Sequence, residues 1–81
     1  MRIHVRLFAI LKDRAGVGRI ELDMPLETSV AGAVQAVGEK FPQIQSLLNQ
    51  AASALNCEYV PAITMLNDGD ELALIPPVSG G

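Results

Sequence analysis

The sequence predicts an α+β fold in which a mixed sheet packs on one main helix and a flexible C-terminal tail projects from the domain. Two N-terminal segments alternate apolar and polar residues, which is typical of half-buried strands. One apolar helical stripe follows, and a last apolar strand lies near the C-terminus. With 81 residues, the chain is expected to form a single small domain over residues 1–75, with the tail at residues 76–81.

The first two strands are expected to pair as a hairpin. Residues 2–8 and 20–24 alternate in polarity, and Pro25 ends the second strand. Residues 9–15 between them are predicted to form a short helical turn closed by Gly16. In the first strand the two faces are Ile3, Val5 and Leu7 on one side and Arg2, His4, Arg6 and Phe8 on the other.

The main helix is expected to start after Thr28 or Ser29, because either hydroxyl can accept a hydrogen bond from a free N–H of the first turn. Pro42 ends it, since the residue before a proline is pushed out of the helical region. Residues 42–48 are predicted to form a second short helix. The apolar stripe of the main helix consists of Val30, Ala33, Val34, Val37 and Phe41.

The C-terminal half is expected to complete the sheet. Residues 52–56 read as a strand, Asn56-Cys57 as a two-residue turn, and residues 58–60 as the returning strand. A turn at 67–69 precedes the last strand, residues 71–75. A right-handed crossover connection allows the first and last strands to lie side by side and parallel in the middle of the sheet. This order of elements is the β-grasp arrangement, the fold of ubiquitin.

Composition excludes several classes of function. A net charge of −3 with only six basic residues argues against binding nucleic acid. One cysteine and one histidine allow no internal disulfide and no zinc site. There is no signal peptide pattern and no apolar run near the ~20 residues that cross a bilayer. We therefore expect a cytoplasmic protein that binds neither membranes nor metals.

The tail carries the most specific chemical signal. Pro76-Pro77 stops the last strand and directs an extended arm that ends in Gly80-Gly81. Six residues reach up to ~20 Å, and glycine can thread a narrow channel. A terminal carboxylate reacts only after activation, for example by adenylation with ATP. Because the chain has no phosphate-binding loop, ATP and Mg must be held by a partner, and the chain is not expected to be an enzyme alone. The alternative is an inert terminus.

The C-terminal segment resembles that of the molybdopterin synthase small subunit family. The resemblance rests on the Asp68-Gly69-Asp70-Glu71 turn, the apolar strand after it, and the ending PPVSGG at residues 76–81. Residues 6–9 and 56–60 resemble the first strand and the central hairpin of that family. Length and element order match across the whole chain.

The resemblance implies a mechanism centred on Gly81, with Gly80 beside it. A ubiquitin-activating-like adenylyltransferase would adenylate Gly81, and a sulfur donor protein would convert it to a thiocarboxylate. The tail, including Val78 and Ser79, would enter the synthase large subunit and deliver sulfur to cyclic pyranopterin monophosphate. The product is molybdopterin, in molybdenum cofactor biosynthesis. Synthases of this family are typically heterotetramers with small subunits at the outer ends.

Three alternatives remain open. Thiamine-type sulfur carriers share the fold and activation chemistry, but they are usually shorter in the segment matching residues 41–50 and usually lack the diproline. A ubiquitin-like protein modifier would use the same tail to form isopeptide bonds with lysines. A β-grasp binding module with an inert tail is the third. A role in tRNA thiolation is also compatible with the sequence.

Strand alternation predicts a docking patch beside the tail. Phe8 and Ile75 are expected on the outer face of the sheet, and the family resemblance implies that Tyr59 lies near the same edge. Together they would form an exposed apolar patch, continued by Pro76 and Pro77. Alternatively, Phe8 folds under the turn at Leu11.

Other reactive residues are expected to have structural roles. Cys57 has no cationic activator nearby in the sequence, and His4 falls on a polar strand face. The acidic residues Asp68, Asp70 and Glu71 are explained by the turn at Gly69 rather than by metal binding.

Overall fold

The computed structural model describes residues 1–77 and confirms the β-grasp fold. One five-stranded sheet has the order β2-β1-β5-β3-β4. Its strands are β1 (Arg2–Leu7), β2 (Arg19–Asp23), β3 (Ala52–Leu55), β4 (Glu58–Tyr59) and β5 (Glu71–Ile75). The helices are α1 (Ala9–Ala15), α2 (Val30–Lys40), a 3-10 turn η1 (Pro42–Ile44) and α3 (Gln45–Leu48).

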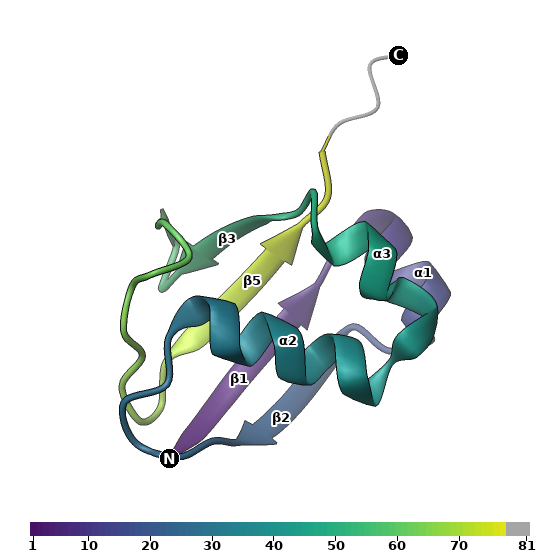
Figure 1. Cartoon of the computed structure of the whole chain (residues 1–81). Coiled ribbons are helices and arrows are strands. Elements are labelled where there is room, and N and C mark those ends of the chain that lie inside the picture. The colour runs from purple at the N-terminus through teal and green to yellow at the C-terminus, as the bar shows by residue number, and fades with distance from the viewer. Residues whose placement is uncertain (78–81) are drawn as a thin grey trace.

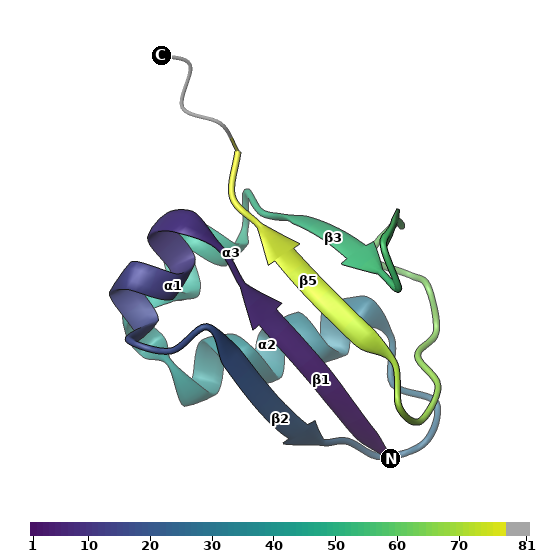
Figure 2. The ribbon, with the colours of Figure 1, turned by 180° about the vertical axis from the view of Figure 1, so that it is seen from behind.

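Strand pairing follows the predicted topology. β1 is antiparallel to β2 and parallel to β5, and β5 is antiparallel to β3. Figure 1 shows α2 lying across one face of this sheet, with α1 and α3 close to the end from which the tail leaves. Seen from behind, in Figure 2, the other face of β1 and β5 carries no helix formed by residues 1–77. The sheet therefore has a covered inner face and a free outer face.

Capping and proline set the bounds of α2. Ser29, and not Thr28, is the N-cap: its Oγ accepts a hydrogen bond from the Gly32 N–H at 3.2 Å. The Thr28 hydroxyl instead donates to the Pro25 carbonyl at 2.7 Å. At the other end, the Phe41 N–H bonds to the Val37 carbonyl before Pro42 begins the 3-10 turn.

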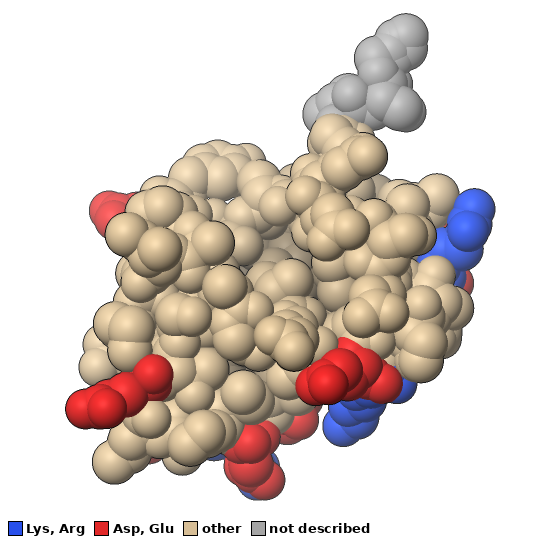
Figure 3. All heavy atoms as spheres, in the orientation of Figure 1, with Lys and Arg blue, Asp and Glu red and all other residues tan. Residues whose placement is uncertain are grey.

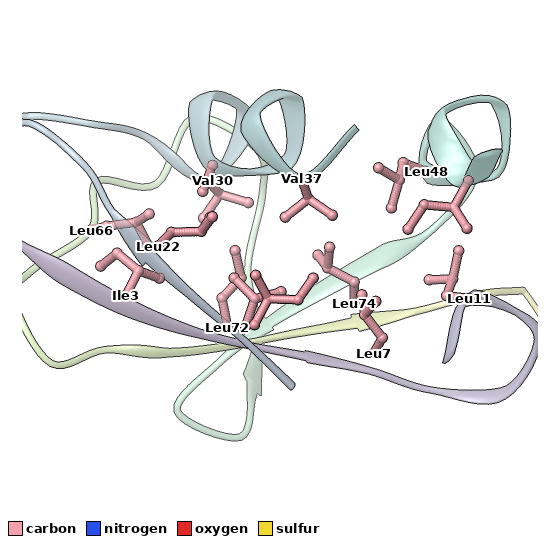
Figure 4. Close-up of a cluster of buried hydrophobic side chains, with 14 residues drawn as sticks. Ile3, Leu7, Leu11, Leu22, Val30, Val37, Leu48, Leu66, Leu72 and Leu74 are labelled. Atoms are coloured by element: carbon pink, nitrogen blue, oxygen red, sulfur yellow. The ribbon is translucent and has the colours of Figure 1, made fainter. Parts of the chain in front are cut away.

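The core fills the space between the inner sheet face and the helices (Figure 4). Removing each large aliphatic side chain from water stabilises the fold by about 1.5–3 kcal/mol. Leu66 joins this core from the segment between β4 and β5, which the sequence pattern did not assign. The fully buried large side chains are Ile3, Val5, Leu7, Leu11, Val30, Val37, Ile44, Leu72 and Leu74.

Close packing on α2 holds α3 in place near the base of the tail. Gly38 is buried, and a Cβ added there would lie only 3.2 Å from Gln45 Cγ. The predicted helix over 42–48 is divided, because η1 forms its first part and α3 its second.

Element ends differ from the sequence prediction by one residue in several places. β1 ends at Leu7 because Phe8 becomes the N-cap of α1 and Ala9 has a left-handed φ of 51°. β2 spans 19–23 rather than 20–24, and β3 stops at Leu55 because the turn starts at Asn56. None of the helices within residues 1–77 has the length and apolar character of a membrane span.

Candidate docking site at the base of the tail

A shallow hollow lies on the outer face of the sheet, next to the start of the tail. Four cross-strand partners, Arg6, Ala73, Ala54 and Tyr59, form one row across β1, β5, β3 and β4. The two alanines make a low floor between the larger side chains. This floor and its walls enclose a volume of about 240 Å³.

The predicted patch residues meet in this hollow. Phe8, Tyr59 and Ile75 all line it; Phe8 is 36% exposed, Tyr59 is 72% exposed and Ile75 is half-buried. The alternative position for Phe8, under the turn at Leu11, is not the one observed, because Leu11 occupies the core and Phe8 belongs to the outer face.

Backbone geometry explains how Phe8 reaches this face. Phe8 is extended, with φ −127° and ψ 156°, so it continues the alternation of β1 beyond the last strand residue. The guanidinium of Arg6 lies over the Phe8 ring, with Cζ 5.2 Å from the ring centre. Arg6 also pairs with Glu71, with Nη1 3.5 Å from Oε1. Phe8 is therefore held beside the only cation that lines the hollow within residues 1–77.

The far wall of the hollow depends on the turn between β3 and β4. Both turn residues have positive φ, 49° at Asn56 and 73° at Cys57, as in tight hairpin turns. The Asn56 side chain accepts a hydrogen bond from the Glu71 N–H and donates one to Asp70, each at 3.1 Å. Cys57 is exposed and lines the hollow.

The acidic residues before β5 stabilise the turn. Asp70 Oδ2 accepts a hydrogen bond from the Asn67 N–H at 2.7 Å, and Asp68 Oδ1 accepts one from the Arg2 N–H at 2.6 Å. Between them, Gly69 has φ 85°, a conformation that favours glycine. Within residues 1–77, no three potential ligand side chains cluster in a way that would hold a metal ion.

Other charged side chains of the outer face lie outside the hollow. On the outer face, Arg2 pairs with Asp23, and the hydrogen-bonded Asp23 carboxylate raises the pKa of the Arg2 guanidinium. His4 Nδ1 lies against the Glu21 carboxylate, so His4 does not take part in the hollow. On the helix-covered side, Figure 3 shows uncharged residues around the base of the tail.

A second depression, which the sequence analysis missed, lies on the helix side of the tail base. It encloses about 540 Å³ between α1, α3 and the diproline. The sequence shows only that Ile10 and Leu47 are apolar; in the structure Ile10 is exposed and Leu47 is half-buried. That the two line one groove depends on tertiary packing. Pro76 and Pro77 line this groove, whereas the predicted site residues Val78, Ser79, Gly80 and Gly81 lie outside the described residues.

Comparison with known proteins identifies the family. A family model described as the ThiS family matches residues 5–81. A molybdopterin synthase sulfur carrier subunit of Dictyostelium discoideum is 38% identical over 80 residues, which cover 95% of this chain and 93% of that protein.

Two solved structures extend the comparison. The modifier protein SAMP1 of Haloferax volcanii superimposes with a TM-score of 0.92 at 29% identity, with both chains fully covered. A chain in the complex of subunits 1 and 2 of the molybdopterin-converting factor from Helicobacter pylori matches with a TM-score of 0.73 at 26% identity, again over both full chains. The chain therefore belongs to the ThiS family, among the ubiquitin-like sulfur carriers of the molybdopterin synthase type.

Proposed function

We propose that this chain is the sulfur-carrying small subunit of a molybdopterin synthase. The single observation that carries the proposal is the hollow in which the apolar side chains of Phe8, Tyr59 and Ile75 meet, directly beside the diproline that leads to Gly81. A carrier needs a surface that a partner can grip while its terminus enters that partner's site. Similarity over the full length to molybdopterin synthase sulfur carrier subunits supports this reading.

The reactive group in this proposal is the Gly81 carboxylate. It attacks the α-phosphorus of ATP, pyrophosphate leaves, and an acyl adenylate forms. Hydrosulfide released by the donor then attacks the acyl carbon; the bond from that carbon to the phosphate oxygen breaks, AMP leaves, and the terminus is a thiocarboxylate. ATP and Mg belong to the activating adenylyltransferase, and the sulfur comes from a donor protein. The chain supplies the acyl terminus and the surface that presents it.

The acceptor of the sulfur is cyclic pyranopterin monophosphate, held by the synthase large subunit. In each transfer the C–S bond at Gly81 breaks as sulfur bonds to the pterin, and water supplies the oxygen that restores the Gly81 carboxylate. Molybdopterin contains two such sulfurs and each charged carrier supplies one, so a spent carrier must leave and be recharged. Because each carrier has one tail, it serves the adenylyltransferase and the large subunit in turn. The related Helicobacter pylori proteins form a complex of subunits 1 and 2, which supports a large subunit as the docking partner.

The test is the intact mass of the protein after incubation with ATP, the adenylyltransferase and a sulfur source. We expect a gain equal to the mass difference between sulfur and oxygen, localised to Gly81. A variant that lacks Gly81 should show no gain. An unchanged mass of the full chain under conditions that charge a known relative would contradict the proposal.

A second candidate function is protein modification, which similarity to the small archaeal modifier protein of Haloferax volcanii favours. In that case the activated Gly81 forms isopeptide bonds with lysine side chains. Peptide mapping of cell extracts for branched lysines that carry the C-terminal residues of this chain distinguishes the two functions.

A further inference from the structure

The groove on the helix side of the tail base has an almost entirely apolar lining. Its walls are Ile10 of α1, Leu47 of α3 and the diproline at the tail. Among the described residues that line it, Gln50 is the only polar one and none is ionisable. Ile10 is 39% exposed, so an apolar surface is open to water here. An occupant that fits this groove is uncharged and apolar.

This groove and the hollow on the outer sheet face share a wall. Phe8 and Ile75 line both depressions, so the two lie on opposite sides of one ridge at the tail base. A partner that covers the hollow therefore reaches the edge of the groove without a gap between them.

The backbone between β1 and α1 is arranged to expose side chains toward both depressions. Ala9 has φ 51°, a left-handed conformation that is unfavourable for alanine. This residue turns the chain so that Phe8 lines the hollow while Ile10 lines only the groove. Strained backbone of this kind often accompanies functional surfaces.

We propose that the synthase large subunit inserts an apolar side chain into this groove, so that it grips the base of the tail from two sides. The proposal rests on the proposed function, because it uses the same partner. Contact on both sides of Ile75 and the diproline fixes the direction in which the tail leaves the domain. The groove is thus a positioning element for sulfur transfer.

The experiment compares matched variants in binding to the large subunit from the same organism, measured by titration calorimetry. Ile10→Ser removes an apolar wall of the groove, and we expect about tenfold weaker binding. Val17→Ser is the control, because Val17 is equally exposed, at 38%, and lies outside both depressions. Unchanged affinity of Ile10→Ser would overturn the proposal.

A second pair of variants introduces a charge. Gln50→Glu places a carboxylate at the apolar groove and should weaken binding about tenfold or more, because the carboxylate must lose water on docking. Gln43→Glu, at an exposed position of η1 outside the groove, should bind as the parent chain does. Circular dichroism of all four variants is the control for folding.

Four further outcomes separate the two proposals and the possible occupants of the groove. If Phe8→Asp weakens binding and the groove variants do not, the groove proposal fails while the proposed function stands. If neither Phe8→Asp nor the groove variants weaken binding, the docking surface of the proposed function fails as well.

In the free carrier, dilution-dependent methyl shifts of Ile10 and Leu47 would assign the groove to a second copy. Nuclear Overhauser contacts from Val78 to Leu47 would assign it to the chain's own tail. Either result would overturn the proposal.

Discussion

The guanidinium of Arg6 lies over the ring of Phe8, with 5.2 Å between Cζ and the ring centre, at the edge of the outer sheet face. Arg6 is also paired with Glu71 of the neighbouring strand β5, so the cation is held from two directions. A cation over an aromatic face restricts the ring at an otherwise exposed position. Phe8 is therefore presented to a partner in a defined orientation.

We expect Arg6→Gln to weaken binding to the large subunit by about two- to fivefold, because an exposed cation–π contact contributes about 0.5–1 kcal/mol. Titration calorimetry measures the change. Arg19→Gln is the matched control: Arg19 is the cross-strand partner of Arg6, also contacts a glutamate, and lies outside the hollow. An equal loss in both variants would assign the effect to general charge rather than to the position of Phe8.

Phe8→Asp is expected to weaken large-subunit binding by about thirtyfold or more, because it places a charge at the centre of an apolar contact. The domain should stay folded, since Phe8 is partly exposed and lies outside the core. Surface plasmon resonance and thermal melting measure the two properties separately. Ile63→Asp, at a side chain that is 82% exposed and outside the hollow, serves as the control. Loss of folding in Phe8→Asp would remove the argument for docking.

Cys57 offers a direct probe of the hollow. Its thiol is exposed in the free chain and lines the same depression as Tyr59. We predict that saturating large subunit slows alkylation of Cys57 by iodoacetamide at least about tenfold, because the bound partner excludes the reagent from the interface core. At a large-subunit concentration near the dissociation constant of the parent complex, the Phe8→Asp variant should show much less protection than the parent chain. Equal rates with and without partner would place the contact elsewhere.

Asn56→Ala should lower the free energy of unfolding by about 1–3 kcal/mol, since alanine disfavours positive φ and the side-chain hydrogen bonds are lost. Asn56 has φ 49° and bonds to both Asp70 and Glu71. Urea denaturation measures the change. Asn49→Ala is the control, because Asn49 is exposed with an ordinary φ of −63°. Similar losses in both variants would contradict a special role for this turn.

Periodicity was sufficient to predict most of the fold. Alternation in β1 located Phe8 on the outer face, and the parallel pairing with β5 placed Ile75 beside it. The position of Tyr59 near the same edge was implied by the family resemblance. The turn at Asn56 and Cys57 was predicted from the residues, and its positive φ values agree with a two-residue hairpin.

The remaining features depend on tertiary packing, which local patterns do not encode. The segment before Leu66 has no regular periodicity, although Met65 forms a bridge to Ser29 and Leu66 enters the core. The groove joins Ile10 of α1 and Leu47 of α3, residues far apart in sequence that both line it at the tail base. No sequence pattern predicted the left-handed conformation of Ala9.

The most direct test of the central claim is a single-turnover reaction of the protein, thiocarboxylated at Gly81, with its large subunit and cyclic pyranopterin monophosphate. The account predicts that molybdopterin forms, that Gly81 returns to a carboxylate, and that Phe8→Asp carrying the same thiocarboxylate reacts far more slowly at limiting concentration. If the charged protein leaves the pterin unchanged while the thiocarboxylate of a related carrier is consumed by the same large subunit, the account is contradicted.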